Sequence, residues 1–239
     1  MKAMNIGEVC TAVGGSILGG SKEEVITSIT TDSRKIEKGC LFIPLAGERF
    51  DGHDFINQAF EKGAVCCLSH KDIEAKGTII KVKDTRKALL DLASYYRGLF
   101  DIKVCAITGS VGKTTTKDMI YSVLSQKYNT LKTQGNFNND IGLPLTIFNL
   151  EESHEAAVFE MGMNNFGELS RLTAVGRPDV AVITNVGVSH IENLGSREGI
   201  LKAKCEIFEG LKKDGTAVLN ADNDMLSTLK GKEKFNTIW

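Results

Sequence analysis

The stretch KVCAITGSVGKTTTKDMIYSVLSQ, residues 103–126, decides the fold expected for this chain. Residues 103–107 form a short apolar run that predicts a strand, and residues 113–126 have the spacing of an amphipathic helix. Glycines at 109 and 112 allow a tight turn that brings backbone N–H groups close to an anion. A strand, a glycine-rich loop and a helix in this order predict a phosphate-binding loop.

The loop is a shortened variant, TGxxGKTT, because Ile107 stands where the usual G-x-x-x-x-G-K-[ST] pattern has its first glycine. The pattern predicts that Lys113 reaches the β- and γ-phosphates of a nucleotide and that the Thr114 hydroxyl binds Mg²⁺. The residues expected to contact ATP are Gly109, Ser110, Val111, Gly112, Lys113, Thr114 and Thr115. The residues of the following helix expected to face the sheet are Met119, Ile120, Val123 and Leu124. A chance glycine-rich turn is the alternative.

Strand, turn and helix patterns repeat on either side of this loop. In the second half, strands are expected at 156–161, 179–184 and 216–220, and a helix at 197–212. In the first half, strands are expected at 26–31, 40–45 and 64–69, and helices at 55–62 and 85–99. The sequence therefore predicts an α/β protein with a small N-terminal domain, residues 1–98, and a phosphate-loop domain with a mostly parallel sheet, residues 99–239.

Composition excludes several classes of protein. The 239 residues include 29 Lys and Arg against 30 Asp and Glu, so no basic excess favours nucleic acid. No apolar run reaches the roughly 18 residues that cross a membrane, and the first ten residues do not resemble a signal peptide. We therefore expect a cytoplasmic protein without membrane insertion, whose six cysteines are reduced thiols.

Two further side chains follow predicted strands, where ligands of parallel sheets bind. Glu160 stands at the carboxyl end of strand 156–161, where its carboxylate could be a second ligand of the Mg²⁺ or bind a water of that ion. The alternative is a solvated glutamate at the sheet edge. His190 follows strand 179–184, but a lone histidine is more often structural or exposed than a metal ligand.

Lys204 is anomalous on its helix. The apolar stripe of helix 197–212 consists of Ile200, Leu201, Ile207, Phe208 and Leu211. At about 100° per residue, this stripe centres near Lys204, whereas Lys202 points to the opposite face. Because burying an unpaired ammonium is costly, Lys204 must pair, lose its proton, be modified or extend its amine to solvent.

The motifs together resemble a known family. TGSVGKTTTK, GNFNNDIGLP, EMGMNNFGEL, TNVGVSHIENLGS, KAKCEIF and VLNADND stand in the order and spacing of the Mur ligases of bacterial cell-wall synthesis. TDSRKIEKGCLFIPLAGERFDGHDF is similar to the nucleotide-sugar domain of that family. The resemblance implies that ATP phosphorylates the carboxylate of a UDP-linked peptide, and that an amine attacks the resulting acyl phosphate.

The resemblance also implies roles for single residues. Lys113, His190 and Lys204 would be catalytic, and Lys204 would be carbamylated. Two Mg²⁺ sites are expected, one at Thr114 and Glu160 and the other involving His190 and the modified Lys204. Ser33 and Arg34 fall where the family contacts uridine diphosphate, although a surface ion pair is the alternative for Arg34. The asparagines expected near the sugar-nucleotide substrate, unless they only form turns, are Asn136, Asn138, Asn139 and Asn164.

Within the family, EMGMNNFGEL favours the branch that adds D-alanyl-D-alanine to UDP-N-acetylmuramoyl-tripeptide over branches that add one amino acid. Family members are longer, so we expect a truncated monomer without the third, C-terminal domain, inactive by itself in ligation. A sister ligase, a non-catalytic nucleotide or UDP-sugar binding fragment, and another phosphate-loop enzyme such as a small kinase remain alternatives.

Overall fold

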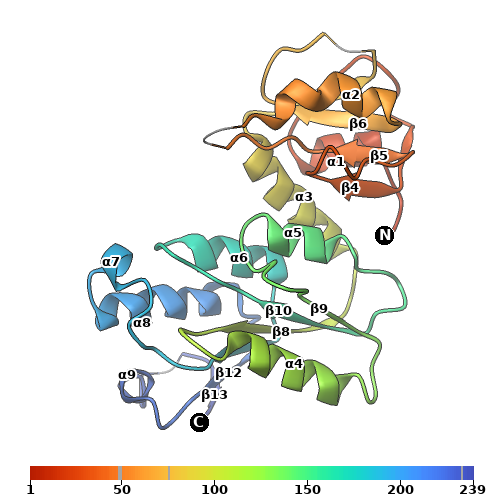
Figure 1. Cartoon of the computed structure of the whole chain (residues 1–239). Helices are drawn as coiled ribbons and strands as arrows, with labels where there is room; N and C mark the ends of the chain where they lie inside the picture. Colours follow the sequence, from red (N-terminus) through yellow and green to blue (C-terminus); the bar gives the residue numbers. More distant parts are fainter. Residues whose placement is uncertain (48–49, 75, 233) are drawn as a thin grey trace. The chain divides into compact units, whose positions relative to one another are not determined.

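The chain forms two α/β units, each with its own sheet (Figure 1). The computed structural model describes residues 1–47, 50–74, 76–232 and 234–239; residues 48 and 49 of the GERFDGHDF motif lie outside this part. The first unit comprises Met1–Tyr96 and Ile147–Glu151, and the second comprises Arg97–Thr146 and Glu152–Trp239. The expected α/β class with a parallel-sheet domain is confirmed.

The first unit is built on a five-stranded sheet in the order β2-β7-β6-β5-β4, together with the antiparallel pair β1-β3. β2 runs antiparallel to β7, whereas β7, β6, β5 and β4 are parallel to their neighbours. The strands are β1 (Met4–Asn5), β2 (Ser16–Leu18), β3 (Val25–Ile26), β4 (Ser28–Thr30), β5 (Cys40–Phe42), β6 (Ala64–Ser69) and β7 (Thr78–Lys81). The helices are α1 (Ile6–Ala12), the 3₁₀ helix η1 (Gly52–Phe55), α2 (Ile56–Glu61) and α3 (Thr85–Gly98).

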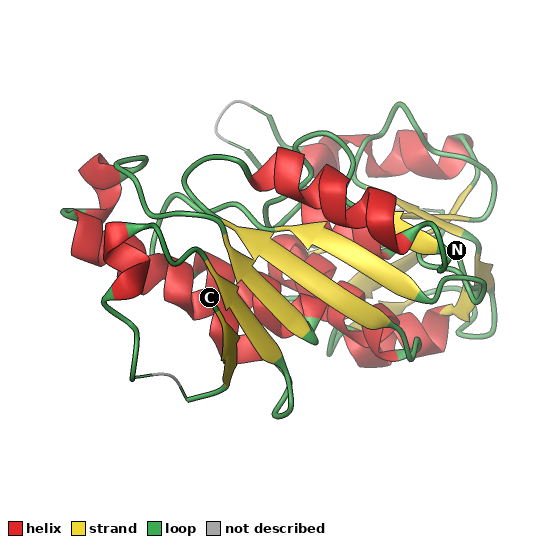
Figure 2. Ribbon diagram, turned by 90° about the horizontal axis from the view of Figure 1, so that it is seen from below, coloured by secondary structure: helices red, strands yellow, loops and turns green. Residues whose placement is uncertain are grey.

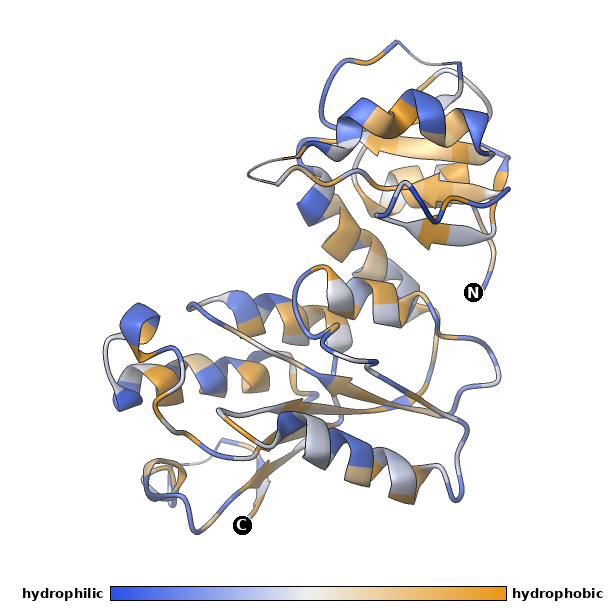
Figure 3. Ribbon diagram, viewed as in Figure 1, coloured by the Kyte–Doolittle hydropathy of each residue, from blue (hydrophilic) through white to orange (hydrophobic). Residues whose placement is uncertain are grey.

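One core cluster of the first unit lies between its sheet and α2. Phe42, Cys67 and Ile79 from three neighbouring strands pack with Ile56 and Ala59 of α2. These apolar side chains follow the alternation of the strands and one face of the helix, so burial fixes the register of both. Figure 3 shows the same pattern as hydrophobic strands beneath a helix with one polar face.

The second unit has a six-stranded parallel sheet in the order β13-β12-β11-β8-β10-β9. Its strands are β8 (Lys103–Thr108), β9 (Thr130–Lys132), β10 (Ala156–Glu160), β11 (Val180–Ile183), β12 (Thr216–Leu219) and β13 (Asn236–Ile238). Its helices are α4 (Lys113–Leu124), α5 (Gly142–Ile147), α6 (Glu168–Gly176), α7 (Ile191–Leu194), α8 (Arg197–Cys205), the 3₁₀ helix η2 (Glu206–Gly210) and α9 (Asp224–Ser227). Helices cover both faces, α4 on one and α6 and α8 on the other (Figures 1 and 2).

The sheet register brings the loops of the site to one edge. β8 lies between β10 and β11, with Glu160 paired to Ile107 and Ile183 paired to Thr108. All three strands run in the same direction, so the loops that follow them leave from the same edge of the sheet. Ligands of open α/β sheets bind at this edge.

The predicted inward face of the helix after the phosphate loop is partly wrong. Met119 and Val123 are 66% and 72% exposed, whereas Ile120 and Leu124 pack on the strands as expected. The buried face instead runs through Lys117, Ile120, Tyr121 and Leu124, which have the i, i+3, i+4, i+7 spacing of one helix face. Lys117 occupies this buried face although its side chain carries a charge.

Two other predicted elements are each split into two shorter elements in the structure. The strand expected at 26–31 becomes β3 and β4, which pair with different partners on either side of Thr27. The helix expected at 197–212 ends at Cys205 and continues as η2, where Leu211 N donates to Phe208 O with the shorter spacing of a 3₁₀ helix. None of the helices in the described part of the chain is both long and apolar enough to cross a membrane.

Candidate phosphate and metal site

The phosphate loop connects β8 to α4 in four residues, 109–112. Gly112 has φ of +80° and Gly109 has φ of +155°, both in the region that favours glycine. A Cβ on Gly109 would also clash with the Thr184 hydroxyl. Lys113 begins α4 and its Nζ donates to Gly109 O at 2.8 Å, so the side chain folds back over the loop.

The start of α4 remains available for an anion. Gly112 occupies the N-cap position, and no side chain of the described residues caps the helix there. The first N–H groups of a helix lack partners within the helix and carry the positive end of its dipole. The 12-residue helix therefore presents backbone donors beside the Lys113 ammonium, which is the arrangement that binds phosphate groups.

Glu160 is buried at the end of β10, with both carboxylate oxygens engaged. Thr114 Oγ1 donates to its Oε2 at 2.9 Å, and Asn138 Nδ2 donates to its Oε1 at 2.8 Å. Its backbone N–H donates to Thr133 Oγ1 at 3.0 Å. The Thr114 hydroxyl uses its proton in this contact and keeps its lone pairs free, so Thr114 and Glu160 together offer the hard oxygen donors that Mg²⁺ prefers.

Lys117 is a residue of this site that sequence reasoning missed. Its side chain is 3% exposed, and its Nζ lies 3.8 Å from Glu160 Oε2 and 3.7 Å from Asp118 Oδ1. Lys117 stands three residues after Thr114 and therefore shares its helix face. That spacing was the available signal, because a lysine on the same face as a predicted metal ligand can meet the same carboxylate.

A cleft of about 210 Å³ brings half of the predicted site residues of the second half together. Its lining includes the predicted residues Gly109, Lys113, Asn138, Asn139, Asn164, His190 and Lys204. Gly162, Met163 and Glu168 complete the lining. Glu160 and Thr114 connect to this cleft through the bond from Asn138.

Lys204 is buried, as its position in the apolar stripe predicted, with 2% of its surface exposed. Burial, followed by repulsion from the Lys113 ammonium, lowers the pKa of Lys204 to about 8. Two lysines thus face one small cleft, and burial disfavours the protonated form of Lys204. Lys202, two residues earlier, is exposed and contacts the ring of Phe166.

His190 adopts a left-handed conformation, φ of +65°, immediately before α7. This conformation is uncommon for a residue with a side chain, and strained backbone of this kind is concentrated at functional sites. In the described ranges, no three His, Cys, Asp or Glu side chains are grouped so that they could hold a metal ion.

The four predicted asparagines have different surroundings. Asn138 holds Glu160, whereas Asn139 Oδ1 accepts from Ile141 N at 3.1 Å and Gly142 N at 2.8 Å where α5 begins. Asn164 N donates to Glu168 Oε2 at 2.7 Å. Asn136 is exposed and is absent from the cleft lining.

Ser33 and Arg34 belong to the first unit, so the cleft of the second unit does not include them. Arg34 is exposed and donates through Nε and Nη2 to the two carboxylate oxygens of Asp32, both at 2.8 Å. These bonds hold the pKa of Asp32 well below its usual range. Ser33 O accepts from Lys62 Nζ at 2.8 Å.

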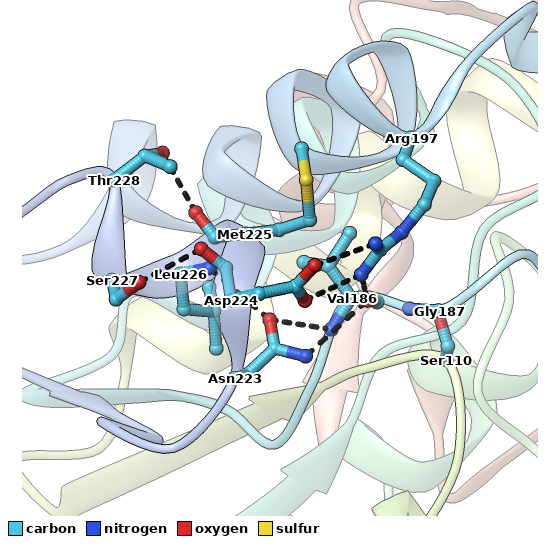
Figure 4. Close-up of polar contacts among 10 residues, drawn as sticks. All are labelled: Ser110, Val186, Gly187, Arg197, Asn223, Asp224, Met225, Leu226, Ser227 and Thr228. Atoms are coloured by element: carbon cyan, nitrogen blue, oxygen red, sulfur yellow. Dashed lines mark hydrogen bonds and ion pairs between the residues drawn. The ribbon is translucent and has the colours of Figure 1, made fainter.

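A second set of contacts supports the loop after β11 and was missed from the sequence (Figure 4). Arg197 donates to the Asp224 carboxylate at 2.7 and 2.6 Å and to Val186 O at 2.9 Å. Asn223 bonds both Val186 N and Val186 O, at 3.4 and 3.3 Å. Gly187 N donates to Ser110 Oγ at 2.9 Å, which links this loop to the phosphate loop.

Curated relatives are similar in sequence to most of this chain. It is 50% identical over 208 residues to the UDP-N-acetylmuramoyl-tripeptide–D-alanyl-D-alanine ligase of Bacillus subtilis (strain 168), a match that covers 86% of this chain and 46% of the relative. It is 41% identical over 224 residues to the ligase of the same name from Escherichia coli (strain K12), covering 94% of this chain and 49% of the relative. The chain thus spans about half the length of these relatives.

Solved structures agree with the fold. A crystal structure of MurF from Acinetobacter baumannii matches with a TM-score of 0.93 and 35% identity, covering 100% of this chain and 53% of that one. The MurF ligase of Thermotoga maritima in complex with ADP matches with a TM-score of 0.83 and 36% identity, covering 88% and 49%.

Two family models match the two halves of the sequence. Residues 25–97 match the Mur ligase family, catalytic domain, and residues 107–238 match the Mur ligase middle domain. The second match covers more than half of the chain and includes the phosphate loop, Glu160, His190 and Lys204. The chain belongs to the Mur ligase family.

Proposed function

We propose that this chain supplies the nucleotide and sugar-nucleotide sites of an ATP-dependent ligase that adds D-alanyl-D-alanine to UDP-N-acetylmuramoyl-tripeptide. The observation that carries the proposal is the 2.9 Å bond from Thr114 of the phosphate loop to Glu160, beside a cleft lined by Lys113 and Lys204. This arrangement can hold the phosphates of ATP next to a second, carboxylate-bearing substrate. The names of the Bacillus subtilis and Escherichia coli relatives support the same substrates.

ATP is held by the loop and the start of α4. The Lys113 ammonium and the first N–H groups of α4 offset the negative charge of the phosphates, and positioning with charge neutralisation accounts for most of the catalysis of phosphoryl transfer. Thr114 and Glu160 would hold a Mg²⁺ ion, which supplies further positive charge at the transferred phosphate when it is bound. Asn138 and Thr133 fix Glu160 in this position.

The reaction then proceeds in two steps. An oxygen of the terminal carboxylate of the peptide bonds to the γ-phosphorus of ATP, and the bond from that phosphorus to ADP breaks. The amine of D-alanyl-D-alanine attacks the acyl carbon, loses a proton and displaces inorganic phosphate. Lys113 and Lys204 line the same cleft, which supports a role for both in stabilising the negative charge that develops in the two steps.

The neutral amine of Lys204 is proposed to attack carbon dioxide: an N–C bond forms, one C–O double bond becomes single, and the nitrogen loses a proton to give a carbamate. Its amine is buried and lies close enough to Lys113 for repulsion, so the cationic form is disfavoured there. A carbamate would turn this cation into an anion with two oxygen donors and would be attracted to Lys113. With His190, it would provide donors for a second Mg²⁺.

The remaining predicted residues are proposed to bind the sugar-nucleotide substrate. Arg34 carries a planar guanidinium suited to phosphate, and Ser33 is its neighbour in the first unit. Asn138, Asn139 and Asn164 line the cleft of the second unit, where they can donate to the substrate. Asn136 precedes them in the same loop.

The test uses a fusion ligase, in which residues 1–239 are joined to the C-terminal half of the Bacillus subtilis relative. We expect phosphate release and ligated product only when ATP, UDP-N-acetylmuramoyl-tripeptide and D-alanyl-D-alanine are all present. Product with a single amino acid in place of the dipeptide would identify a sister ligase. Transfer of phosphate to a hydroxyl without the tripeptide would show a kinase and contradict the proposal. A parallel assay of the 239-residue chain alone shows whether it binds nucleotide without forming the ligated product.

A further inference from the structure

The tip of the phosphate loop, residues 110 and 111, is short and depends on hydrogen bonds to residues outside the loop. β8 extends to Thr108 and α4 begins at Lys113, so the N–H groups of Ser110 and Val111 belong to neither element. Each of these N–H groups needs an acceptor, which can be a backbone carbonyl, a side chain or water. Ordinary phosphate loops have a longer glycine-rich connection than this one.

Asn185 accepts from both of these donors. It stands two residues after the end of β11, and its Oδ1 lies 3.1 Å from Ser110 N and 3.0 Å from Val111 N. Ser110 N also donates to the backbone O of Asn185 at 3.1 Å, whereas the Val111 donor is bonded by the side chain. Its Nδ2 donates to Val111 O at 3.3 Å. The Asn185 carboxamide therefore accepts from two N–H groups of the loop tip and donates to one carbonyl group there.

The contacts around Asn185 hold it in place. Thr184 Oγ1 donates to Val111 O at 2.7 Å, and Gly187 N donates to Ser110 Oγ at 2.9 Å. Val186, between them, is bonded by Arg197 and by Asn223 (Figure 4). The segment 184–187 is therefore fixed on one side by α8 and α9 and on the other by the phosphate loop.

We propose that Asn185 is a positioning residue that holds the phosphate loop in its nucleotide-binding shape before ATP arrives. The side chain fixes the loop tip, so the N–H groups at the start of α4 keep their direction toward the phosphates. A loop ordered in advance loses less conformational entropy on binding, which raises affinity. This inference rests on the proposed function only in taking ATP as the ligand of the loop.

The experiment uses the 239-residue chain and two variants, Asn185→Ala and Asn220→Ala. Asn220 is the matched control, because its Nδ2 bonds Thr184 O at 3.2 Å, at the same strand end, without contacting the loop. Amide hydrogen exchange at Ser110 and Val111, followed by NMR, reports whether the loop tip is held. Titration with MgATP measures the Kd. If Asn185 only stabilised the fold, its replacement would leave this Kd unchanged at temperatures far below unfolding.

For Asn185→Ala we expect exchange at the Val111 amide to rise about 10-fold and the Kd for MgATP to rise about 10-fold, the size of about one net hydrogen bond. The Ser110 amide keeps the backbone carbonyl of residue 185 as an acceptor and should change less. Asn220→Ala should stay within about 2-fold of the wild type. Asn185→Asp keeps acceptor oxygens and should retain slow exchange, which separates the role from a failure to fold. Wild-type exchange and affinity in Asn185→Ala would overturn the proposal. A wild-type chain that binds no MgATP would contradict the proposed function, while the exchange rates would still decide the role of Asn185.

Discussion

Lys113→Met in the fusion ligase is expected to lower kcat/KM for ATP by about 1,000-fold, the scale seen when a charged donor to a developing anion is lost. Lys113 begins α4 and folds over the loop to Gly109 O, so its ammonium already lies at the proposed phosphate site. Methionine fills similar space without the charge. The steady-state rate of phosphate release at varied ATP measures the effect.

Lys103→Met is the control for the Lys113 prediction. Lys103 begins the strand that leads into the loop, but its side chain is exposed and pairs with Asp179 on the surface. Exposed ion pairs contribute about 0–1 kcal/mol, so this variant should keep the wild-type rate within about 2-fold. A Lys113→Met enzyme as active as the Lys103→Met enzyme would show that the loop does not bind the reacting phosphates.

Lys204→Ala is expected to lower kcat of the fusion ligase by at least about 100-fold, because a carbamate bound to a metal would be lost. The variant leaves space for a small acid. Added formate or acetate should therefore restore part of the activity by supplying the missing carboxylate oxygens. Mass spectrometry of the wild-type protein under carbon dioxide should detect the carbamate after chemical trapping.

Lys202→Ala provides the control for Lys204→Ala, since it lies on the same helix with its amine in solvent. It should retain wild-type activity and should not respond to added acids. Full activity of Lys204→Ala without bicarbonate or short-chain acids would contradict the carbamate. A loss of activity that no acid restores would leave Lys204 as a buried amine and would contradict its role as a modified ligand.

Local and periodic signals in the sequence predicted the centre of the second unit well. Strand 103–107, the loop and the start of the helix at Lys113 follow from contiguous residues, and the structure has β8 and α4 there. The burial of Lys204 followed from helical phase alone, because its apolar neighbours recur around it. Both signals depend on residues close in sequence.

The errors and omissions concern contacts between distant residues. Lys117 shares a helix face with Thr114, but its burial beside Glu160, 43 residues later, depends on a contact between distant residues. Once Lys117 is placed inward, Met119 and Val123 must point outward. Asn185 reaches the loop because β11 and β8 are neighbours in the sheet, which depends on strand order. The split of the predicted strand 26–31 into β3 and β4 at Thr27 likewise depends on which strands pair.

The most direct test of the account follows an isotope from the peptide to phosphate. UDP-N-acetylmuramoyl-tripeptide labelled with ¹⁸O in its terminal carboxylate is incubated with the fusion ligase, ATP and D-alanyl-D-alanine. If the carboxylate attacks the γ-phosphate, the bridging oxygen leaves with phosphate, and mass spectrometry should find one ¹⁸O atom in each phosphate released. Product formed with unlabelled phosphate would contradict the acyl phosphate and the function proposed for this site.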